Sequence, residues 1–161
     1  MITSLAFIST SLALNSFLHL NYFNSFVLLN ISYFFDCLDG HYARSYNMVT
    51  VFGDYYDHFS DMFKFFGLII LSYYLDYCKF VIMFPLLIMC TILMLLHMGC
   101  QEVYFSYKNN SIKAPTLSIL KVFCPAENIT ELQGMMKLTR FMGTGTFNLM
   151  LSLIPIFYSF N

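Results

Sequence analysis

Four of the six aspartates in the chain fall in one short pattern whose spacing indicates metal chemistry. Asp36 and Asp39 are three residues apart, and Asp57 and Asp61 are four apart. Residues at either spacing lie on one face of a helix, so each pair of carboxylates points to one side. Two carboxylates about 5 Å apart repel by about 3 kcal/mol at an effective dielectric of about 20. Hard divalent cations offset that repulsion, because they prefer oxygen ligands.

Two such cations about 3.5–4 Å apart are suited to phosphoryl or nucleotidyl transfer, because together they clamp the entering and leaving oxygens. All four aspartates are therefore predicted to bind a hard divalent cation, Mg²⁺, Mn²⁺ or Ca²⁺, with a second ion nearby. The alternative interpretation is that these carboxylates only mark the ends of helices at a membrane surface. That explains any single aspartate, but it does not explain four of them at regular spacing on consecutive segments.

The segment between the two pairs supplies groups suited to a phosphate. Gly40 lets a ligand approach the backbone closely, and the small side chain of Ala43 leaves room for the ligand on the same side of the helix. Arg44 carries a planar guanidinium fork that matches phosphate oxygens. Thr50 and Gly53 come just before the next apolar segment, where a hydroxyl and free backbone N–H groups can face an anion.

Lys64 lies three residues after Asp61, on the same helical face. This position leaves two roles equally open. The ammonium group is either an ion-pair partner for the carboxylates or a contact for a phosphate.

The elements that hold these residues are predicted from composition. The chain has 161 residues, of which 58% are hydrophobic and 11% charged. Soluble domains carry about 25% charged residues, so this composition argues against a soluble globule, and its high hydrophobicity argues against disorder. A net charge of −1 supplies no basic field for nucleic acid. We predict an all-α, polytopic transmembrane helix bundle, surrounded by membrane lipids, that forms a single domain over residues 1–161.

Five membrane spans are expected, because a helix needs about 20 mostly apolar residues to cross a bilayer. They run at about residues 2–20, 22–35, 55–77, 80–98 and 141–160. The second is short and reaches full length only if its helix continues through Asp36. The polar stretch 99–140 is expected to lie outside the bilayer, with 115–123 as a short helix along the interface.

Orientation follows from the basic residues, which favour the cytoplasmic side of a membrane. Arg44 follows the second span, and five more basic residues follow the fourth: Lys108, Lys113, Lys121, Lys137 and Arg140. The opposite side offers only Lys79. The protein is therefore predicted to be a multi-pass integral membrane protein whose acidic cluster faces the cytoplasm. Sequons at Asn109 and Asn128 are interpreted as chance matches on that side.

The five cysteines are odd in number and contain no CxxC pair. Neither a disulfide nor a structural zinc site is expected from this pattern.

The acidic pattern resembles the signature of the CDP-alcohol phosphatidyltransferases, D-x2-D-G-x2-A-R-x8-G-x3-D-x3-D. Every gap has the family's length, and the matching residues are Asp36, Asp39, Gly40, Ala43, Arg44, Gly53, Asp57 and Asp61. The resemblance implies that a CDP-linked alcohol binds with its pyrophosphate on the metals. A second alcohol, either a lipid or a polar molecule, then attacks the phosphorus distal to the cytidine, and CMP leaves. This is a reaction of phospholipid biosynthesis.

The resemblance also implies a role for each position. Asp36, Asp39 and Asp57 correspond to metal ligands, and Asp61 corresponds to a ligand that is also the catalytic proton acceptor. The residues assigned to substrate binding are Asp39, Gly40, Ala43, Arg44, Thr50, Gly53 and Lys64. Family members usually have six spans, whereas five are expected here and the C-terminal half is shortened. A homodimer is compatible with the resemblance.

The acceptor alcohol is weakly indicated. His58 follows Asp57 as in the choline/ethanolamine branch, whereas His41 after Gly40 resembles the inositol branch. The aminoalcohol branch is slightly favoured over an inositol- or glycerol-phosphate-type transferase. Two other classes stay open, a shortened non-catalytic homologue that binds CDP-alcohol and a cation transporter. The transporter leaves the glycines and the arginine of the pattern unexplained.

Overall fold

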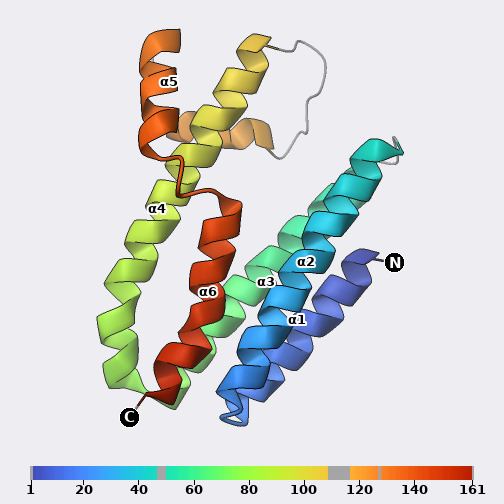
Figure 1. Cartoon of the computed structure of the whole chain (residues 1–161), viewed down its shortest axis with the longest axis vertical. Coiled ribbons are helices and arrows are strands. Elements are labelled where there is room, and N and C mark those ends of the chain that lie inside the picture. The colour runs from blue at the N-terminus through green and yellow to red at the C-terminus, as the bar shows by residue number, and fades with distance from the viewer. Residues whose placement is uncertain (1, 47–49, 109–116, 127, 161) are drawn as a thin grey trace. The chain divides into compact units, whose positions relative to one another are not determined.

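The computed structural model describes residues 2–46, 50–108, 117–126 and 128–160, and all regular secondary structure in them is helical (Figure 1). The all-α prediction is confirmed for this part of the chain. The helices in order are α1 (Ile2–Leu18), α2 (Tyr22–Ser45), α3 (Val51–Leu75), α4 (Tyr77–Lys108), the 3-10 helix η1 (Leu117–Phe123), α5 (Ile129–Leu138) and α6 (Thr144–Ser159).

The packing divides the chain into two compact units. Unit 1 comprises Met1–Ile82 and Asn148–Asn161, and unit 2 comprises Met83–Phe147. Unit 1 therefore holds the first three helices, the beginning of α4 and most of α6. The single domain over the whole chain stays a prediction.

The two helices that carry the aspartates both extend beyond the expected spans. α2 continues past residue 35 to Ser45, so Asp36 and Asp39 are helical, as a full-length second helix requires. α3 begins at Val51 because Thr50 caps it in an extended conformation. The Thr50 hydroxyl accepts a hydrogen bond from the backbone N–H of Gly53 at 3.1 Å, which satisfies one of the free donors of the first turn.

One helix in the described residues, Tyr77–Tyr107, is long and apolar enough to cross a membrane, and Thr3–Leu18 forms a shorter apolar helix. The first of these extends beyond the expected fourth span at both ends and contains Pro85. α2 and α3 are less apolar than this helix, because they carry the charged residues of the acidic cluster. The five-span arrangement stays a prediction.

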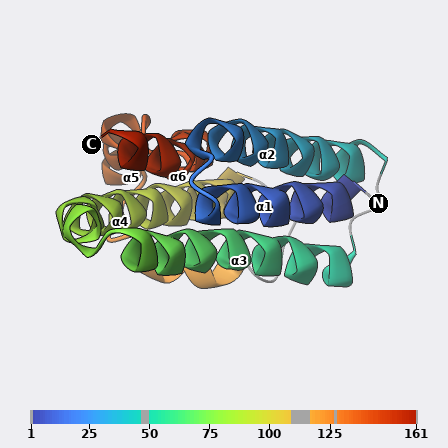
Figure 2. The ribbon, with the colours of Figure 1, turned by 90° about the horizontal axis from the view of Figure 1, so that it is seen from below.

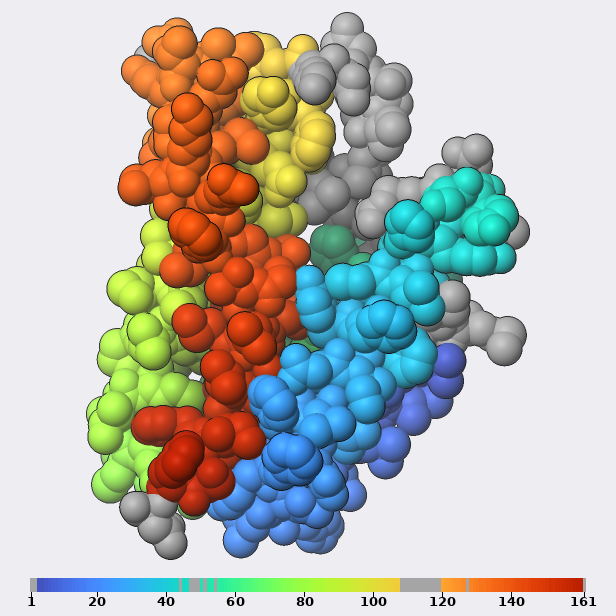
Figure 3. All heavy atoms as spheres, in the orientation of Figure 1, coloured from blue at the N-terminus to red at the C-terminus, as the bar shows by residue number. Residues whose placement is uncertain are grey.

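Small and hydroxylated side chains join α1 to α2. Ala6, Thr10 and Ala13 are buried and recur at helical spacing on α1. Thr10 and Ser32 share a hydrogen bond of 2.7 Å between their hydroxyls, and the Ser32 hydroxyl donates to the carbonyl of Ala6 at 3.0 Å. Such residues let helix backbones approach closely. The atoms of α1 and α2 accordingly form one continuous surface (Figure 3), and α1 lies between α2 and α3 (Figure 2).

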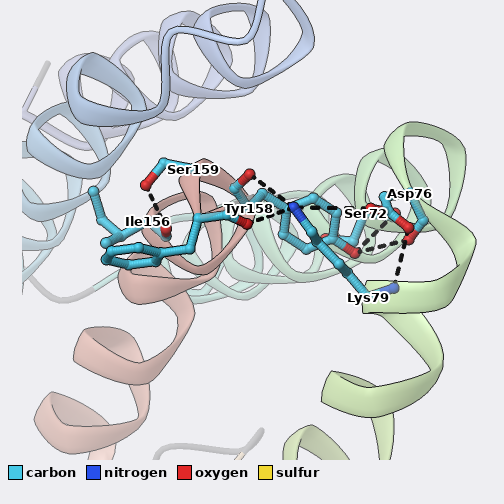
Figure 4. A network of polar contacts seen from close by, with 7 residues as sticks. Ser72, Asp76, Lys79, Ile156, Tyr158 and Ser159 are labelled. Carbon is cyan, nitrogen blue, oxygen red and sulfur yellow. Dashed lines mark hydrogen bonds and ion pairs between the residues drawn. The ribbon is translucent and has the colours of Figure 1, made fainter.

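The C-terminal end of α6 is held at the junction of α3 and α4 (Figure 4). The hydroxyl of Tyr158 donates to the carbonyl of Ser72 at 2.9 Å. The ammonium group of Lys79 donates to the carbonyls of Tyr158 and Phe160 at 3.3 and 2.8 Å. A cation at this position satisfies the free carbonyls of the last helical turn and is favoured by the helix dipole. These contacts fix the end of α6 in unit 1.

Unit 2 corrects the expectation that the cysteines stay unpaired, because Cys100 and Cys124 form a disulfide. The bond joins α4 to the residue that follows η1. Gly99 makes the approach feasible, since a Cβ atom there would lie 2.5 Å from the backbone oxygen of Leu120. Sequence spacing does not show this pairing, because it depends on how η1 folds back onto α4. η1 itself confirms the short helix expected at 115–123, whereas α5 was not anticipated.

Candidate functional site

The aspartates of α2 and those of α3 interact across the two helices. The carboxyl groups of Asp36 and Asp57 share a hydrogen bond, which requires a proton on one of them. The charge of Asp61 acts on Asp36, and the charge of Asp39 acts on Asp57. Each of the four aspartates therefore interacts with an aspartate of the opposite helix.

Asp36 lies just beyond the expected second span, and its pKa reflects its burial and the negative charge of the neighbouring aspartates. Its partial burial, its hydrogen bond with Asp57 and the charge of Asp61 raise its pKa from an ordinary value of 3.8 to about 8. The nearby ammonium group of Lys64 acts in the opposite direction. Four carboxyl groups on two neighbouring helices carry negative charge that a proton or a cation can balance.

The other two aspartates are held by partners outside the acidic pattern. Asp39 accepts a hydrogen bond from the hydroxyl of Thr3 on α1. Asp61 forms an ion pair with Lys64, with 3.0 Å between Oδ1 and the ammonium nitrogen. The Asp61 side chain is 53% exposed, so it is open to a reacting molecule. Sequence reasoning missed Thr3, because no motif marks a hydroxyl 36 residues from its partner.

Lys64 is a buried cation. Only 3% of the residue is exposed, and its ammonium group donates a second hydrogen bond to Oδ1 of Asn148 on α6, at 3.1 Å. The sequence left an ion pair and a phosphate contact equally open, and the structure shows the ion pair. Asn148 was also missed, since it lies 84 residues from Lys64 and belongs to no motif.

The donor chemistry of the cluster fits Mg²⁺ or Mn²⁺, which prefer carboxylate oxygens. No three acidic, histidine or cysteine side chains of the described residues are gathered as a ready-made metal site. Asp39 and Asp61 instead have partners outside the cluster, Thr3 and Lys64. The hydrogen bond between Asp36 and Asp57 is a contact that a cation would replace.

The remaining predicted residues flank the aspartates. Gly40 and Ala43 lie on α2 and are partly buried. The side chain of Arg44 lies outside the part of the chain that the structure describes. Thr50 and Gly53 bond to each other in the N-terminal cap of α3, so their contact with a substrate stays a prediction.

The comparisons with known proteins agree with the acidic pattern. The model of the family described as CDP-alcohol phosphatidyltransferase matches residues 1–155, which include all four aspartates together with Lys64 and Asn148. No curated protein and no solved structure matches the chain. The family match spans almost the whole sequence and both helices of the site. The chain therefore belongs to the CDP-alcohol phosphatidyltransferase family.

Proposed function

We propose that the protein transfers a substituted phosphate group from a CDP-alcohol to an acceptor alcohol and releases CMP, in phospholipid biosynthesis. The observation that carries the proposal is the contact between carboxyl groups of α2 and α3, in a chain of this family. A cluster of four carboxyl groups with one lysine beside it suits a site that takes up cations together with a diphosphate ester.

Asp36, Asp39, Asp57 and Asp61 would hold Mg²⁺ or Mn²⁺, with two ions expected, and the pyrophosphate end of the donor would bind to these ions. When bound, the ions neutralise charge on the phosphate oxygens and on the leaving group. The acceptor hydroxyl oxygen forms a bond to the phosphorus distal to the cytidine, and the bond from that phosphorus to the bridging oxygen breaks. The bridging oxygen keeps the electron pair and leaves as part of CMP.

Asp61 takes the proton of the acceptor hydroxyl. A carboxylate within hydrogen-bond reach of the hydroxyl is a suitable general base, and the exposure of the Asp61 side chain supports this role. Gly40, Ala43 and Arg44 contact the CDP portion of the donor from α2, and Thr50 and Gly53 contact it from the start of α3.

The proposal extends to the membrane and to the acceptor. The protein is proposed to be a multi-pass integral membrane protein, which the apolar helix Tyr77–Tyr107 supports for one span and the other apolar segments of the sequence support for the rest. The basic residues after the second and fourth expected spans support an active site on the cytoplasmic side. His58, next to Asp57, supports the aminoalcohol branch. An inositol- or glycerol-phosphate-type transferase, and a non-catalytic homologue that binds CDP-alcohol, are the alternatives.

A CMP-release assay on the purified protein in detergent tests the proposal. The donors are CDP-choline, CDP-ethanolamine and CDP-diacylglycerol, each offered with diacylglycerol, inositol or glycerol phosphate and with Mg²⁺ or Mn²⁺. We expect cation-dependent release of CMP, fastest with an aminoalcohol donor. Asp61→Asn should lower the rate by about 10²–10⁴-fold, the usual contribution of a general base. Its thermal unfolding midpoint should also fall, because the buried Lys64 ammonium group loses its opposite charge, so the assay is run at a temperature where the variant is folded.

Glu102→Gln is the matched control, because it removes a carboxylate from α4 in unit 2 rather than from the cluster. Its rate should equal that of the wild type. A wild-type protein that releases no CMP with any pair would contradict the transferase. Binding of a CDP-alcohol without turnover would instead favour the non-catalytic homologue.

A further inference from the structure

The buried ammonium group of Lys64 connects the acidic cluster to the C-terminal helix. It lies 3.0 Å from Oδ1 of Asp61 and 3.1 Å from Oδ1 of Asn148. A buried cation is costly unless an opposite charge pairs with it and acceptors satisfy its N–H groups. Asp61 supplies the charge and Asn148 supplies the second acceptor, so the position of Lys64 depends on both.

A second contact between α6 and α3, besides that of Asn148 with Lys64, fixes the position of α6 along the axis of α3. Tyr158, ten residues after Asn148, bonds to the carbonyl of Ser72, eight residues after Lys64. These intervals correspond to about 15 Å along α6 and about 12 Å along α3. Both contacts therefore agree with one arrangement in which the two helices run in the same direction.

We propose that Asn148 is a positioning residue of the active site, which holds the Lys64 ammonium group on Oδ1 of Asp61 and so presents Oδ2 to the reacting hydroxyl. The inference rests on the proposed function, in which Asp61 takes the proton. It assigns a role to a helix outside the acidic pattern.

Loss of the Asn148 acceptor should affect the chemical step rather than donor binding. Lysine has a flexible four-carbon stem, so its ammonium group moves when one of two acceptors is removed. Asp61 then loses the partner that orients it, and a misplacement of about 1 Å in a reacting group costs about 10²-fold in rate. The Asn148 variant keeps all four carboxylates and the residues between them, so the KM for the CDP-alcohol should change little.

Steady-state kinetics of Asn148→Leu test this role, because leucine has a similar size and no acceptor. We expect kcat to fall by about 10-fold or more, with the KM for the CDP-alcohol within about twofold of the wild type. Asn148→Gln keeps the amide and should have a kcat closer to that of the wild type. Ser152→Ala is the matched control on α6, since its hydroxyl bonds within its own helix to Leu149, and it should change neither constant.

A double-mutant cycle with Lys64→Met shows whether the two residues act as one unit. The double variant should lose no more kcat than Lys64→Met alone, and the losses in thermal unfolding midpoint should be equally non-additive. An unchanged kcat in Asn148→Leu, or losses that multiply, would overturn the positioning role while the transferase still stands. If the wild type released no CMP, the proposed function and the catalytic role would both fail, and the unfolding cycle would show whether the contact is structural.

Discussion

At the scale of single residues, the proposed site consists of carboxyl groups that contact each other. Asp36 and Asp57 share a hydrogen bond, while Asp39 and Asp61 each have a partner outside the pattern. A structure optimised for stability alone would not place like charges together, because each buried charge needs an opposite charge or a hydrogen bond. The proposed uptake of cations accounts for this arrangement, and it predicts that stability depends on cations.

Asp36→Asn should stabilise the cation-free protein and abolish most of its activity. The carboxyl groups of Asp36 and Asp57 bond to each other only when one of them is protonated. The amide of asparagine donates a hydrogen bond to Asp57 without such a proton, so the repulsion between the two carboxylates disappears. The gain is expected to be about 1 kcal/mol, or about 2–4 °C in the thermal unfolding midpoint measured in EDTA. Added Mn²⁺ should raise the midpoint of the wild type more than that of the variant.

Cys37→Ala is the matched control for that comparison, because it changes the exposed neighbour of Asp36 on the same helix. Its midpoint should follow the wild type with and without Mn²⁺. A lower midpoint for Asp36→Asn in EDTA would show that the carboxyl pair is stabilising as it stands.

At the scale of the helices, local sequence and close packing together place the site. α3 carries Asp57, Asp61 and Lys64 on one face because these residues follow at i, i+4 and i+7. Thr50 begins that helix early enough to include Asp57 well inside it. In unit 2, by contrast, the approach of η1 to α4 depends on the absence of a side chain at Gly99.

Gly99→Ala should destabilise unit 2 by about 1–3 kcal/mol, as overpacking of a tight contact does. The new Cβ atom would lie 2.5 Å from the carbonyl oxygen of Leu120, and a backbone atom cannot rotate away as a side chain can. η1 must then move off α4, and the Cys100–Cys124 disulfide should form less completely. The fraction of free thiol, measured by alkylation and mass spectrometry, checks this.

Gly134→Ala provides the matched control in the same unit. A Cβ atom at Gly134 would meet nothing within 4 Å, and alanine is the better helix former. This variant should be at least as stable as the wild type, with the disulfide complete. Equal behaviour of the two variants would contradict the close contact between Gly99 and η1.

At the scale of the whole molecule, the proposed orientation in a membrane is open to a direct test within unit 1. α3 has 25 residues and is therefore about 37 Å long, which exceeds the roughly 30 Å of a bilayer's hydrocarbon core. Cys37 lies next to Asp36, and Asp36 contacts Asp57 near the start of α3. Cys78 lies just after the end of α3. Both thiols are free and exposed, whereas Cys90 is buried.

A membrane-impermeant maleimide should reach these two cysteines from opposite sides of sealed vesicles. Cys78→Ser leaves Cys37 as the exposed thiol, and it should be labelled only when the cytoplasmic face is outward. Cys37→Ser leaves Cys78, which should be labelled only in the reverse orientation. Labelling of both from one side would rule out a membrane-spanning α3, and the reversed order would rule out a cytoplasmic active site.

The sequence by itself determined the helical class and the approximate positions of most helices, and it located the four aspartates of the proposed site. These features are local, because helical spacing, apolar runs and a threonine before an apolar segment depend only on near neighbours. The family also followed from the sequence, since its signature lies within 26 consecutive residues, Asp36 to Asp61. α5 was missed because its segment is short and polar.

Only the tertiary structure decided which partners hold those aspartates and which cysteines pair. Thr3 with Asp39, Lys64 with Asn148, and Cys100 with Cys124 are separated by 36, 84 and 24 residues. The chain has several threonines, asparagines and cysteines that are chemically equivalent before folding. The packing of α1, α6 and η1 selects one of each, because a hydrogen bond or a disulfide forms only between groups that the fold brings within a few ångströms.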